Sequence, residues 1–347
     1  MEIVSRIDNN LENLGVFKDF SDDTLKTVFD AGGKQIIEVT LIANKENIDV
    51  ICVPTHHFCN LGCKMCHLTN KGLNKQMQPI NSIYFIEALI KGVIKQAQDG
   101  NFVRRTENKK LLISFMGVGE PLLNLKLIEE VYNKEQYLKE VLAYEEIGYA
   151  IATIMPTDVS KLIKLVNRLN IPLKLHFSLH TPITKDRCNL IPATKVSVEN
   201  ALAFLIKFKN AVQANSNIAN KYANFHVTND PIEIHYTLIE NINDNDNALK
   251  IICELLTKYR IPIKFLIFNP TNEMRISEKE DLWVSTIKNK IPGLRVVTYS
   301  PPGREVGSSC GEFTKHYYHE ELETSEQLAE FEEWKRKHQI FETDYVK

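Results

Sequence analysis

The stretch Cys52-Val-Pro-Thr-His-His-Phe-Cys59-Asn-Leu-Gly-Cys63-Lys-Met-Cys66 contains three cysteines in the spacing CxxxCxxC. Thiolates spaced in this way on one short loop can bind three irons of a 4Fe–4S cluster, and the fourth iron then has no protein ligand. An open iron can bind a small molecule directly at the cluster. The loop therefore predicts a 4Fe–4S centre held by Cys59, Cys63 and Cys66.

Two other kinds of metal site fit this loop less well. A structural zinc site usually has four protein ligands in two pairs, and here His67 would be an awkward fourth ligand. A ferredoxin would need a fourth cysteine close by, but the next cysteine in the chain is Cys188. Zinc remains the alternative to an iron–sulfur cluster at this point.

A cluster with one open iron is typical of radical S-adenosylmethionine (SAM) enzymes, which this loop resembles. In those enzymes the amino and carboxylate groups of SAM bind the open iron. An electron from the cluster then cleaves SAM to a 5′-deoxyadenosyl radical, so the cofactor carries the difficult chemistry. The expected cofactors are a 4Fe–4S cluster and SAM.

Length and charge limit the remaining possibilities. The 347 residues can form one barrel-type domain with short additions at each end. Lys and Arg total 42 against 44 Asp and Glu, a balance that does not favour a large phosphate-binding surface. Met1–Asn10 does not resemble a signal peptide, and no apolar run reaches the length of a membrane span. We therefore expect a cytoplasmic protein without membrane contact, in which the cysteine loop binds metal and forms no disulfide framework.

The order of predicted elements indicates an α/β fold. Apolar, β-branched segments predict strands at 35–42, 49–53, 111–116, 149–154, 173–179, 232–239, 263–268 and 294–299. Apolar residues at helical spacing predict helices at 83–97, 125–142, 157–169, 196–213, 246–259 and 278–290. Repeated strand–helix units imply a parallel sheet, and six or more of them suit a partial (β/α)6 TIM-like barrel of the radical SAM type.

We divide the chain into three parts on this basis. Residues 1–44 form a short N-terminal extension with a strand and one or two small helices, the helices predicted from Leu11, Leu14, Phe17 and the residues after them. Residues 45–300 form the core barrel. Residues 301–347 carry a loop with Cys310 and a charged tail, in which Thr324 and Gln327 form a capping box for a helix that extends to about His338.

The polar segments follow predicted strands, where the chemistry of a barrel is located. They are Cys59–Cys66, Gly117–Glu120 and Ser178–His180. In Met116-Gly-Val-Gly-Glu-Pro-Leu-Leu-Asn124 a glycine-containing turn is followed by a carboxylate. Glycines allow the backbone to approach a ligand closely, and a carboxylate can accept hydrogen bonds from an ammonium group.

Taken together, these segments resemble the radical SAM adenine methyltransferases of ribosomal RNA, the RlmN/Cfr family. Six motifs match in the same order: Glu38-Val39-Thr40, Cys52 seven residues before the cluster motif, Gly117–Asn124, Ser178-Leu179-His180 followed by Arg187 and Pro192, Phe268-Asn269-Pro270, and Ser309-Cys310-Gly311. The resemblance extends from about Gln35 to Phe313. Only 51 residues precede Cys52, so the chain resembles a divergent member with a shortened N-terminal region.

The resemblance implies a methyl transfer in two stages. The thiolate of Cys310 would take a methyl group from one SAM, and a radical from a second SAM would activate that S-methyl group for addition to an sp² carbon of adenine. Glu38 would remove the ring proton. Cys52 would then attack the sulfur of Cys310, which releases the product and leaves a disulfide.

The same resemblance assigns residues to SAM. Gly119 and Glu120 would hold its methionine end. Its remaining polar groups would contact residues at three other strand ends, namely Thr153, Ser178, Leu179, His180 and Asn269. The implied partners are an RNA, either ribosomal or transfer RNA, and an electron donor such as flavodoxin or ferredoxin, with the chain acting as a monomer.

Two other functions stay open on the sequence. A radical SAM enzyme could carry out a different reaction on a small molecule or a protein, in which case Cys310 is never methylated. A non-catalytic zinc-binding module would hold tetrahedral zinc and no cluster. The sequence does not choose between carbon 2 and carbon 8 of adenine.

Overall fold

The computed structural model describes residues 11–32, 35–42, 47–68, 77–99, 108–271, 274–306 and 325–341. The chain forms two compact units. The first consists of Met1–Asn60, Asn70–Gly148 and Pro302–Lys347, and the second consists of Leu61–Thr69 and Tyr149–Pro301.

The strands of the first unit are hydrogen-bonded in the order β5-β4-β3-β2-β1-β11. Their bounds are β1 Glu12–Lys18, β2 Leu25–Asp30, β3 Ile36–Ile42, β4 Ile48–Cys52, β5 Lys110–Phe115 and β11 Gln339–Phe341. Neighbouring strands from β4 to β11 are antiparallel, whereas β4 and β5 are parallel. The strands predicted at 35–42, 49–53 and 111–116 are therefore present.

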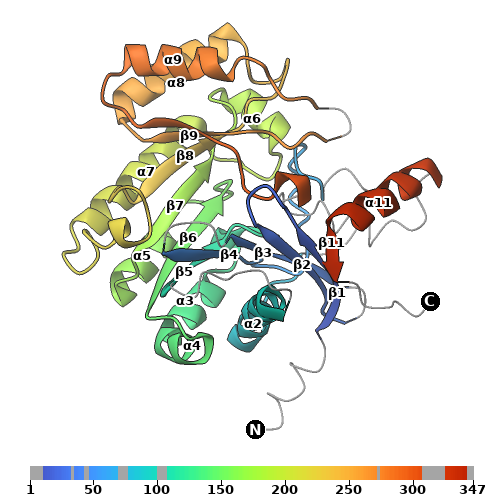
Figure 1. The fold of residues 1–347 in the computed structure, drawn as a ribbon. Helices are drawn as coiled ribbons and strands as arrows, with labels where there is room; N and C mark the ends of the chain where they lie inside the picture. The colour runs from blue at the N-terminus through green and yellow to red at the C-terminus, as the bar shows by residue number, and fades with distance from the viewer. Residues whose placement is uncertain are drawn as a thin grey trace. The chain divides into compact units, whose positions relative to one another are not determined.

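The prediction of small helices near the N-terminus is wrong, because residues 12–30 form the antiparallel pair β1 and β2 (Figure 1). The turn between them is closed by aspartate side chains: the backbone N–H groups of Ser21 and Thr24 donate to Asp19 and Asp22, at 2.9 and 3.0 Å. Asp23 between them has a positive φ of 58°. Such turns favour a hairpin over a continuous helix.

The described residues of the first unit contain four helices. Their bounds are α2 Ile83–Asp99, α3 Leu125–Asn133, α4 Glu135–Leu142 and α11 Ser325–His338, and two 3₁₀ turns lie at Pro121–Leu123 and Arg304–Val306. The helix predicted at 125–142 is two helices separated at Lys134. The C-terminal helix ends at His338 as predicted, while Thr324 of its proposed capping box lies outside the described residues.

The strands of the second unit are all parallel, in the order β10-β9-β8-β7-β6. Their bounds are β6 Glu146–Thr153, β7 Leu173–Ser178, β8 Ile232–Tyr236, β9 Ile263–Leu266 and β10 Val296–Tyr299. The division between the two units falls within β6. The predicted strands are confirmed, and the carboxyl ends of these parallel strands share one edge of the sheet.

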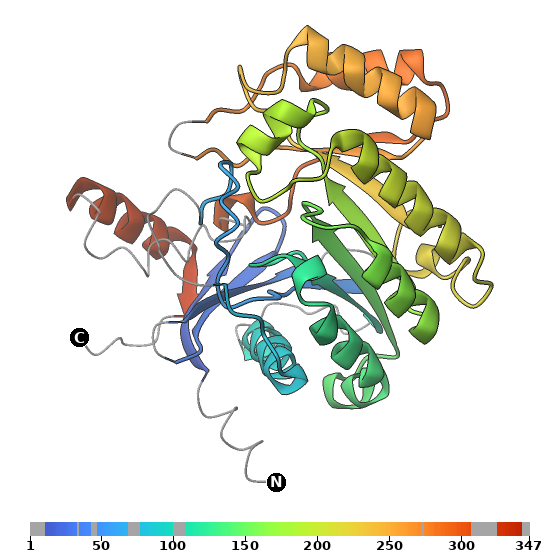
Figure 2. The ribbon, with the colours of Figure 1, turned by 180° about the vertical axis from the view of Figure 1, so that it is seen from behind.

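Helices alternate with these strands, as the sequence predicts. Their bounds are α5 Ser160–Leu169, α6 Thr184–Leu190, α7 Val198–Gln213, α8 Asp246–Tyr259 and α9 Glu280–Lys290. Figures 1 and 2 show α5 and α7 side by side along β7. Ser197 and Asn245 cap α7 and α8, since their side chains accept hydrogen bonds from the N–H groups of Asn200 and Ala248. The short α6 was not predicted.

The two faces of β8 differ in character, and this difference positions the polar residues described below. Tyr236 packs against Trp283 of α9, with ring centroids 5.5 Å apart, and both side chains are buried. Glu233 and His235 alternate with Ile234 and Tyr236, so they lie on the opposite face. No helix within the described ranges is long and apolar enough to cross a membrane.

Candidate active site

The glycine turn after β5 is packed directly on the chain that leads into the cysteine loop. Within the first unit, the N–H groups of Thr55 and His56 donate to the carbonyl of Val118, at 2.9 and 3.2 Å. The N–H of Gly117 donates to the carbonyl of Val53 at 3.1 Å. Two strand ends that lie far apart in the sequence are thus joined backbone to backbone.

Only glycine fits at two positions of this turn. A Cβ at Gly117 would lie 2.7 Å from backbone atoms of Val53, and one at Gly119 would lie 2.5 Å from Oγ1 of Thr55 and still closer to the His56 ring. Gly119 also has a φ of +114°, which L side chains rarely adopt. The close backbone approach inferred from the glycines is therefore present, and it is directed at Val53–His56.

Glu120 and Asn124 are both buried beside this turn. One carboxylate oxygen of Glu120 accepts a hydrogen bond from the N–H of Leu122 at 3.0 Å, so the side chain caps the 3₁₀ turn at Pro121–Leu123. Asn124 donates to the carbonyls of Thr55 and Ile80, at 2.8 and 2.9 Å. Glu120 is thus held in one orientation at the end of β5.

Cys52 and Glu38 lie on the same face of the first unit's sheet. Thr40 is opposite Cys52 in the β3–β4 register, and Lys26 is opposite Thr40 in the β2–β3 register. Side chains alternate along a strand, so Glu38, two residues before Thr40, shares that face. The structure therefore places the two residues on adjacent strands of one face, with Cys52 at the carboxyl end of β4.

Lys26 is a residue of this face that sequence reasoning missed. Its ammonium lies 2.7 Å from a carboxylate oxygen of Glu38, and the side chains are 1% and 2% exposed. A buried charge needs a partner of opposite charge, so this contact keeps a carboxylate compatible with the interior. The alternation of Leu25–Asp30 could have indicated the inward position of Lys26 had these residues been read as a strand.

The cysteine loop carries three half-buried thiols. Cys59 belongs to the first unit, and Cys63 and Cys66 belong to the second. Within the second unit the N–H of Cys66 donates to the carbonyl of Cys63 at 2.9 Å, and the N–H of Lys64 donates to the carbonyl of Leu190 at the same distance. Thiols that are neither fully buried nor on a regular element suit metal ligands better than core residues, in contrast to Cys253, which is 4% exposed on α8.

Cys310 lies outside the described residues, so its position relative to Cys52 stays a prediction. The six cysteines of the described ranges form no disulfide with one another.

In the second unit the predicted residues lie at or after the carboxyl ends of β6, β7 and β9. Thr153 is the last residue of β6, and its hydroxyl accepts a hydrogen bond from the N–H of Met155 at 2.8 Å. Ser178 is the last residue of β7 and is half-buried, whereas Leu179 is fully buried. Asn269 is half-buried and follows β9.

Arg187 ties two of these strand ends together. Its guanidinium is fully buried and donates to the carbonyls of Ile154, Ser178 and Leu179, at 2.7, 3.0 and 3.1 Å. A further hydrogen bond, 3.0 Å long, reaches the hydroxyl of Thr194. The sequence identified Arg187 only as part of a motif, and the structure assigns it the positioning of Ser178 and Leu179.

His180 has an unusual backbone conformation and a neutral ring. Its φ is +56°, and its Nδ1 accepts a hydrogen bond from the N–H of Thr237 at 3.2 Å. Burial, together with the charge of Arg187 and the nearby His235, lowers the pKa of His180 to about 3. The ring is therefore neutral at physiological pH, with its proton on Nε2.

His56, beside the cysteine loop, is also held neutral. Burial and the neighbouring His57 lower the pKa of His56 to about 4. Its Nδ1 lies 2.8 Å from the hydroxyl of Thr55. A neutral His56 adds no positive charge to the start of the loop.

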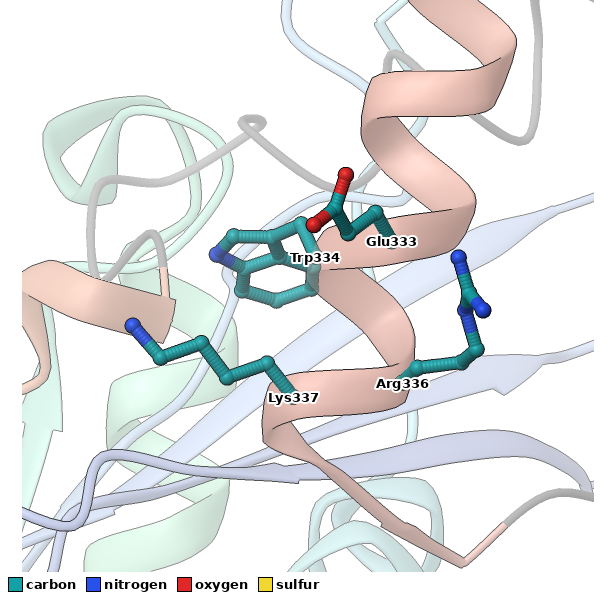
Figure 3. A pocket seen from close by; sticks show the side chains of 4 residues that line it. All are labelled: Glu333, Trp334, Arg336 and Lys337. Atoms are coloured by element: carbon teal, nitrogen blue, oxygen red, sulfur yellow. The ribbon is translucent and has the colours of Figure 1, made fainter.

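A separate surface pocket lies on α11 and contains none of the predicted site residues. It is lined by Glu333, Trp334, Arg336 and Lys337, with the Trp334 ring between the charged side chains (Figure 3).

Comparison with known proteins supports the resemblance seen in the motifs. The chain is 26% identical over 308 residues to the probable dual-specificity RNA methyltransferase RlmN of Clostridioides difficile, which covers 85% of this chain and 77% of the relative. It is 24% identical over 328 residues to the dual-specificity RNA methyltransferase RlmN of a Marinomonas species, covering 91% and 79%. No protein-family model matches.

The fold has a counterpart among solved structures. A radical SAM methyltransferase from Sphaerobacter thermophilus superposes with a TM-score of 0.65 at 19% sequence identity, over 87% of this chain and 80% of that one. The predicted α/β fold of the radical SAM type, with its partial barrel, is thereby confirmed. The chain is a divergent relative of the RlmN-type radical SAM RNA methyltransferases, a class of enzymes.

Proposed function

We propose that the chain is a radical SAM methyltransferase that methylates an sp² carbon of an adenine in RNA through an S-methylcysteine intermediate on Cys310. The proposal rests on the six motifs in order and on relatives named as RNA methyltransferases. It includes a cytoplasmic monomer that receives electrons from a small carrier such as flavodoxin or ferredoxin. The substrate is a ribosomal or a transfer RNA.

The residues present fit a 4Fe–4S cluster and SAM. Cys59, Cys63 and Cys66 would bind three irons, which their half-buried thiols permit. When bound, the cluster and SAM supply a carbon-centred radical. Gly119 and Glu120 would hold the methionine end of SAM, and Thr153, Ser178, Leu179, His180 and Asn269 would contact its remaining polar groups.

The packing of Gly117–Glu120 on Val53–His56 is the observation that carries this proposal. The backbone contacts fix a buried carboxylate beside the chain that enters the cysteine loop. An enzyme that binds SAM next to its cluster needs an acceptor for the SAM ammonium at that place.

The remaining steps of the proposed reaction are assigned to three cysteine and glutamate side chains of this protein. Cys310 would carry the methyl group on its sulfur, and Glu38, which is paired with Lys26, would take the proton from the adenine ring. Cys52, on the same sheet face as Glu38, would attack the sulfur of Cys310 and release the product. A disulfide between Cys52 and Cys310 would then need reduction before the next turnover.

The test compares two single variants expressed anaerobically with native RNA present. Cys310→Ala should show neither protein methylation nor a protein–RNA cross-link. Cys52→Ala should still be methylated at Cys310 and should retain the RNA covalently, because the releasing disulfide cannot form. Mass spectrometry of the Cys310 peptide after nuclease and protease digestion detects the attached nucleotide.

The outcome separates the proposal from the other reactions of radical SAM enzymes. A Cys52→Ala protein with no nucleotide on its Cys310 peptide and no methyl group there would overturn the two-cysteine route. The cluster would then serve a different radical reaction.

A further inference from the structure

A buried cluster of metal-binding side chains lies on β7 and β8 of the second unit, next to Ser178, which pairs with His235 in the parallel register. His176 is opposite Glu233 in the parallel register, and His235 is two residues beyond Glu233. All three side chains therefore lie on the face of the sheet opposite Tyr236 and Trp283. One ligand atom from each lies within 4.8 Å of the other two.

The ring nitrogens of the two histidines converge on one oxygen. Nδ1 of His176 lies 3.3 Å and Nε2 of His235 lies 3.8 Å from Oε2 of Glu233. The imidazole rings themselves are 4.4 Å apart. Neither nitrogen makes a hydrogen bond of good geometry within the described part of the chain.

Because both nitrogens are buried, leaving them without a hydrogen bond is energetically unfavourable. The side chains of His176, Glu233 and His235 are 6%, 4% and 9% exposed. A buried polar atom without a hydrogen bond destabilises a fold, so an unsatisfied pair on one face calls for a ligand. Lone pairs of two imidazoles and a carboxylate are donors that a transition-metal ion accepts.

Three cationic side chains lie near the Glu233 carboxylate and affect whether a metal ion can bind there. Lys264 lies 2.9 Å from Oε2, Arg295 lies 3.9 Å from Oε1, and the buried Lys174 is two residues before His176. The Lys264 ammonium and both imidazole nitrogens lie near the same carboxylate oxygen, so Lys264 would compete with a bound cation for Oε2. Its side chain is 20% exposed, and it also lies over the Tyr299 ring at 5.1 Å, so a long flexible chain can withdraw from the carboxylate.

We propose that His176, Glu233 and His235 form a binding site for a divalent transition-metal ion such as zinc, with Lys264 as the cation that holds the site when no metal is bound. Two imidazoles and one carboxylate are a ligand set that zinc uses with a fourth position open to water or substrate. The site uses none of the cysteines of the loop, and a metal ion bound there goes beyond the proposed methyl transfer.

The experiment uses the full chain with its cluster reconstituted anaerobically. Zinc chloride is added, the excess is removed by gel filtration, and zinc and iron are measured in the same sample. We expect one zinc per wild-type chain that is absent from the double variant His176→Ala/His235→Ala, with equal iron in both. Iron content and circular dichroism verify that the variant is folded and that its cysteines are occupied.

Lys264→Met supplies the matched variant that keeps all three ligands. Because Lys264 competes with the metal for Oε2, this variant should bind zinc at least tenfold more tightly than the wild type in competition with a chelator. Cobalt(II) should give visible bands of nitrogen and oxygen coordination, without the intense charge-transfer band of thiolate ligands.

Equal zinc in the wild type and the double histidine variant would overturn the proposal, because the zinc would then lie elsewhere. If the double variant does not fold, Glu233→Gln replaces it, and unchanged zinc affinity in that variant counts equally against the site. No outcome depends on RNA or SAM, so failure of this proposal and failure of the methyltransferase proposal are distinguishable.

Discussion

At the scale of single residues, the ion pair between Lys26 and Glu38 places two opposite charges side by side in the interior of the first unit. Both side chains are almost fully buried, at 1% and 2% exposed. A buried carboxylate without its partner is strongly unfavourable, whereas replacement of both charges by neutral groups often costs little. The pair therefore has its largest effect when only one member is removed.

We predict that Lys26→Met lowers the free energy of unfolding by about 3–5 kcal/mol. The double variant Lys26→Met/Glu38→Gln should recover much of that loss, because it leaves no uncompensated charge. Urea unfolding followed by circular dichroism measures both variants. Equal destabilisation of the single and the double variant would show that the pair matters through packing and not through charge.

His180 should make the protein less stable in acid. Its pKa is lowered to about 3 in the folded state, mainly by burial, while an unfolded histidine titrates near 6.5. Between these values the unfolded state binds a proton that the folded state does not, so stability falls as pH falls from about 6.5 towards 3. Each pH unit in that window costs up to about 1.4 kcal/mol.

His180→Asn isolates this contribution, because asparagine keeps an acceptor for the N–H of Thr237 and does not titrate. Between pH 7 and pH 5 the wild type should lose about 2 kcal/mol more than the variant. Urea unfolding at the two pH values gives the comparison. Parallel losses in both proteins would assign the acid sensitivity to other groups.

At the scale of elements, the turn Gly117–Glu120 determines where the chain before the cysteine loop can lie. A Cβ at Gly119 meets Thr55 at 2.5 Å and adds the strain of a positive φ. Gly293 also has a positive φ, of +77°, but a Cβ there would meet only the end of the Arg260 side chain, at 3.8 Å. An alanine at Gly293 therefore tests the cost of the backbone strain alone, whereas an alanine at Gly119 tests the strain together with the steric collision.

We expect Gly293→Ala to lose about 1 kcal/mol, the cost of the backbone conformation alone. Gly119→Ala should lose about 2–4 kcal/mol, because overpacking adds to the same strain. It should also retain less iron after reconstitution, since the shifted turn displaces Val53–His56. Thermal unfolding and iron analysis measure both effects, and similar values for the two variants would contradict the steric argument.

Elements were predictable from the sequence where local patterns decide them. The strand–helix alternation from Asp49 onward follows from periodicity, and the structure contains these elements, except that the helix predicted at 125–142 is divided at Lys134. The hairpin of β1 and β2 was missed because Leu11, Leu14 and Phe17 also match helical spacing. The aspartates of its turn carried the deciding information.

The candidate site was predictable only in part, for a related reason. Spacing along the chain identified the cysteines and the glycine turn. The contacts of Lys26 with Glu38, of Arg187 with Ile154, and of His176 with Glu233 depend on which strands become neighbours. Such contacts join residues that are distant in the sequence, and no local pattern specifies them.

At the scale of the whole molecule, seven cysteines have to serve different purposes in one chain. Cys253 is buried on the packed face of α8, and burial raises the pKa of its thiol, so it behaves as a small apolar residue. Cys188 is half-buried on α6, with its sulfur 3.6 Å from the carbonyl of Thr194. Neither has the spacing or the position of a cluster ligand.

The cysteines should therefore separate by metal content in five single alanine variants. Wild-type protein reconstituted anaerobically should hold about four irons per chain and show an EPR signal that changes when SAM is added. Cys59→Ala, Cys63→Ala and Cys66→Ala should each lose most of the iron and all SAM cleavage, since three ligands are the fewest that hold such a cluster with one open iron. Cys188→Ala and Cys253→Ala should keep both properties. Wild-type yields of 5′-deoxyadenosine from any of the first three variants would remove that cysteine from the cluster, and zinc in place of iron in the wild type would favour the zinc-binding module.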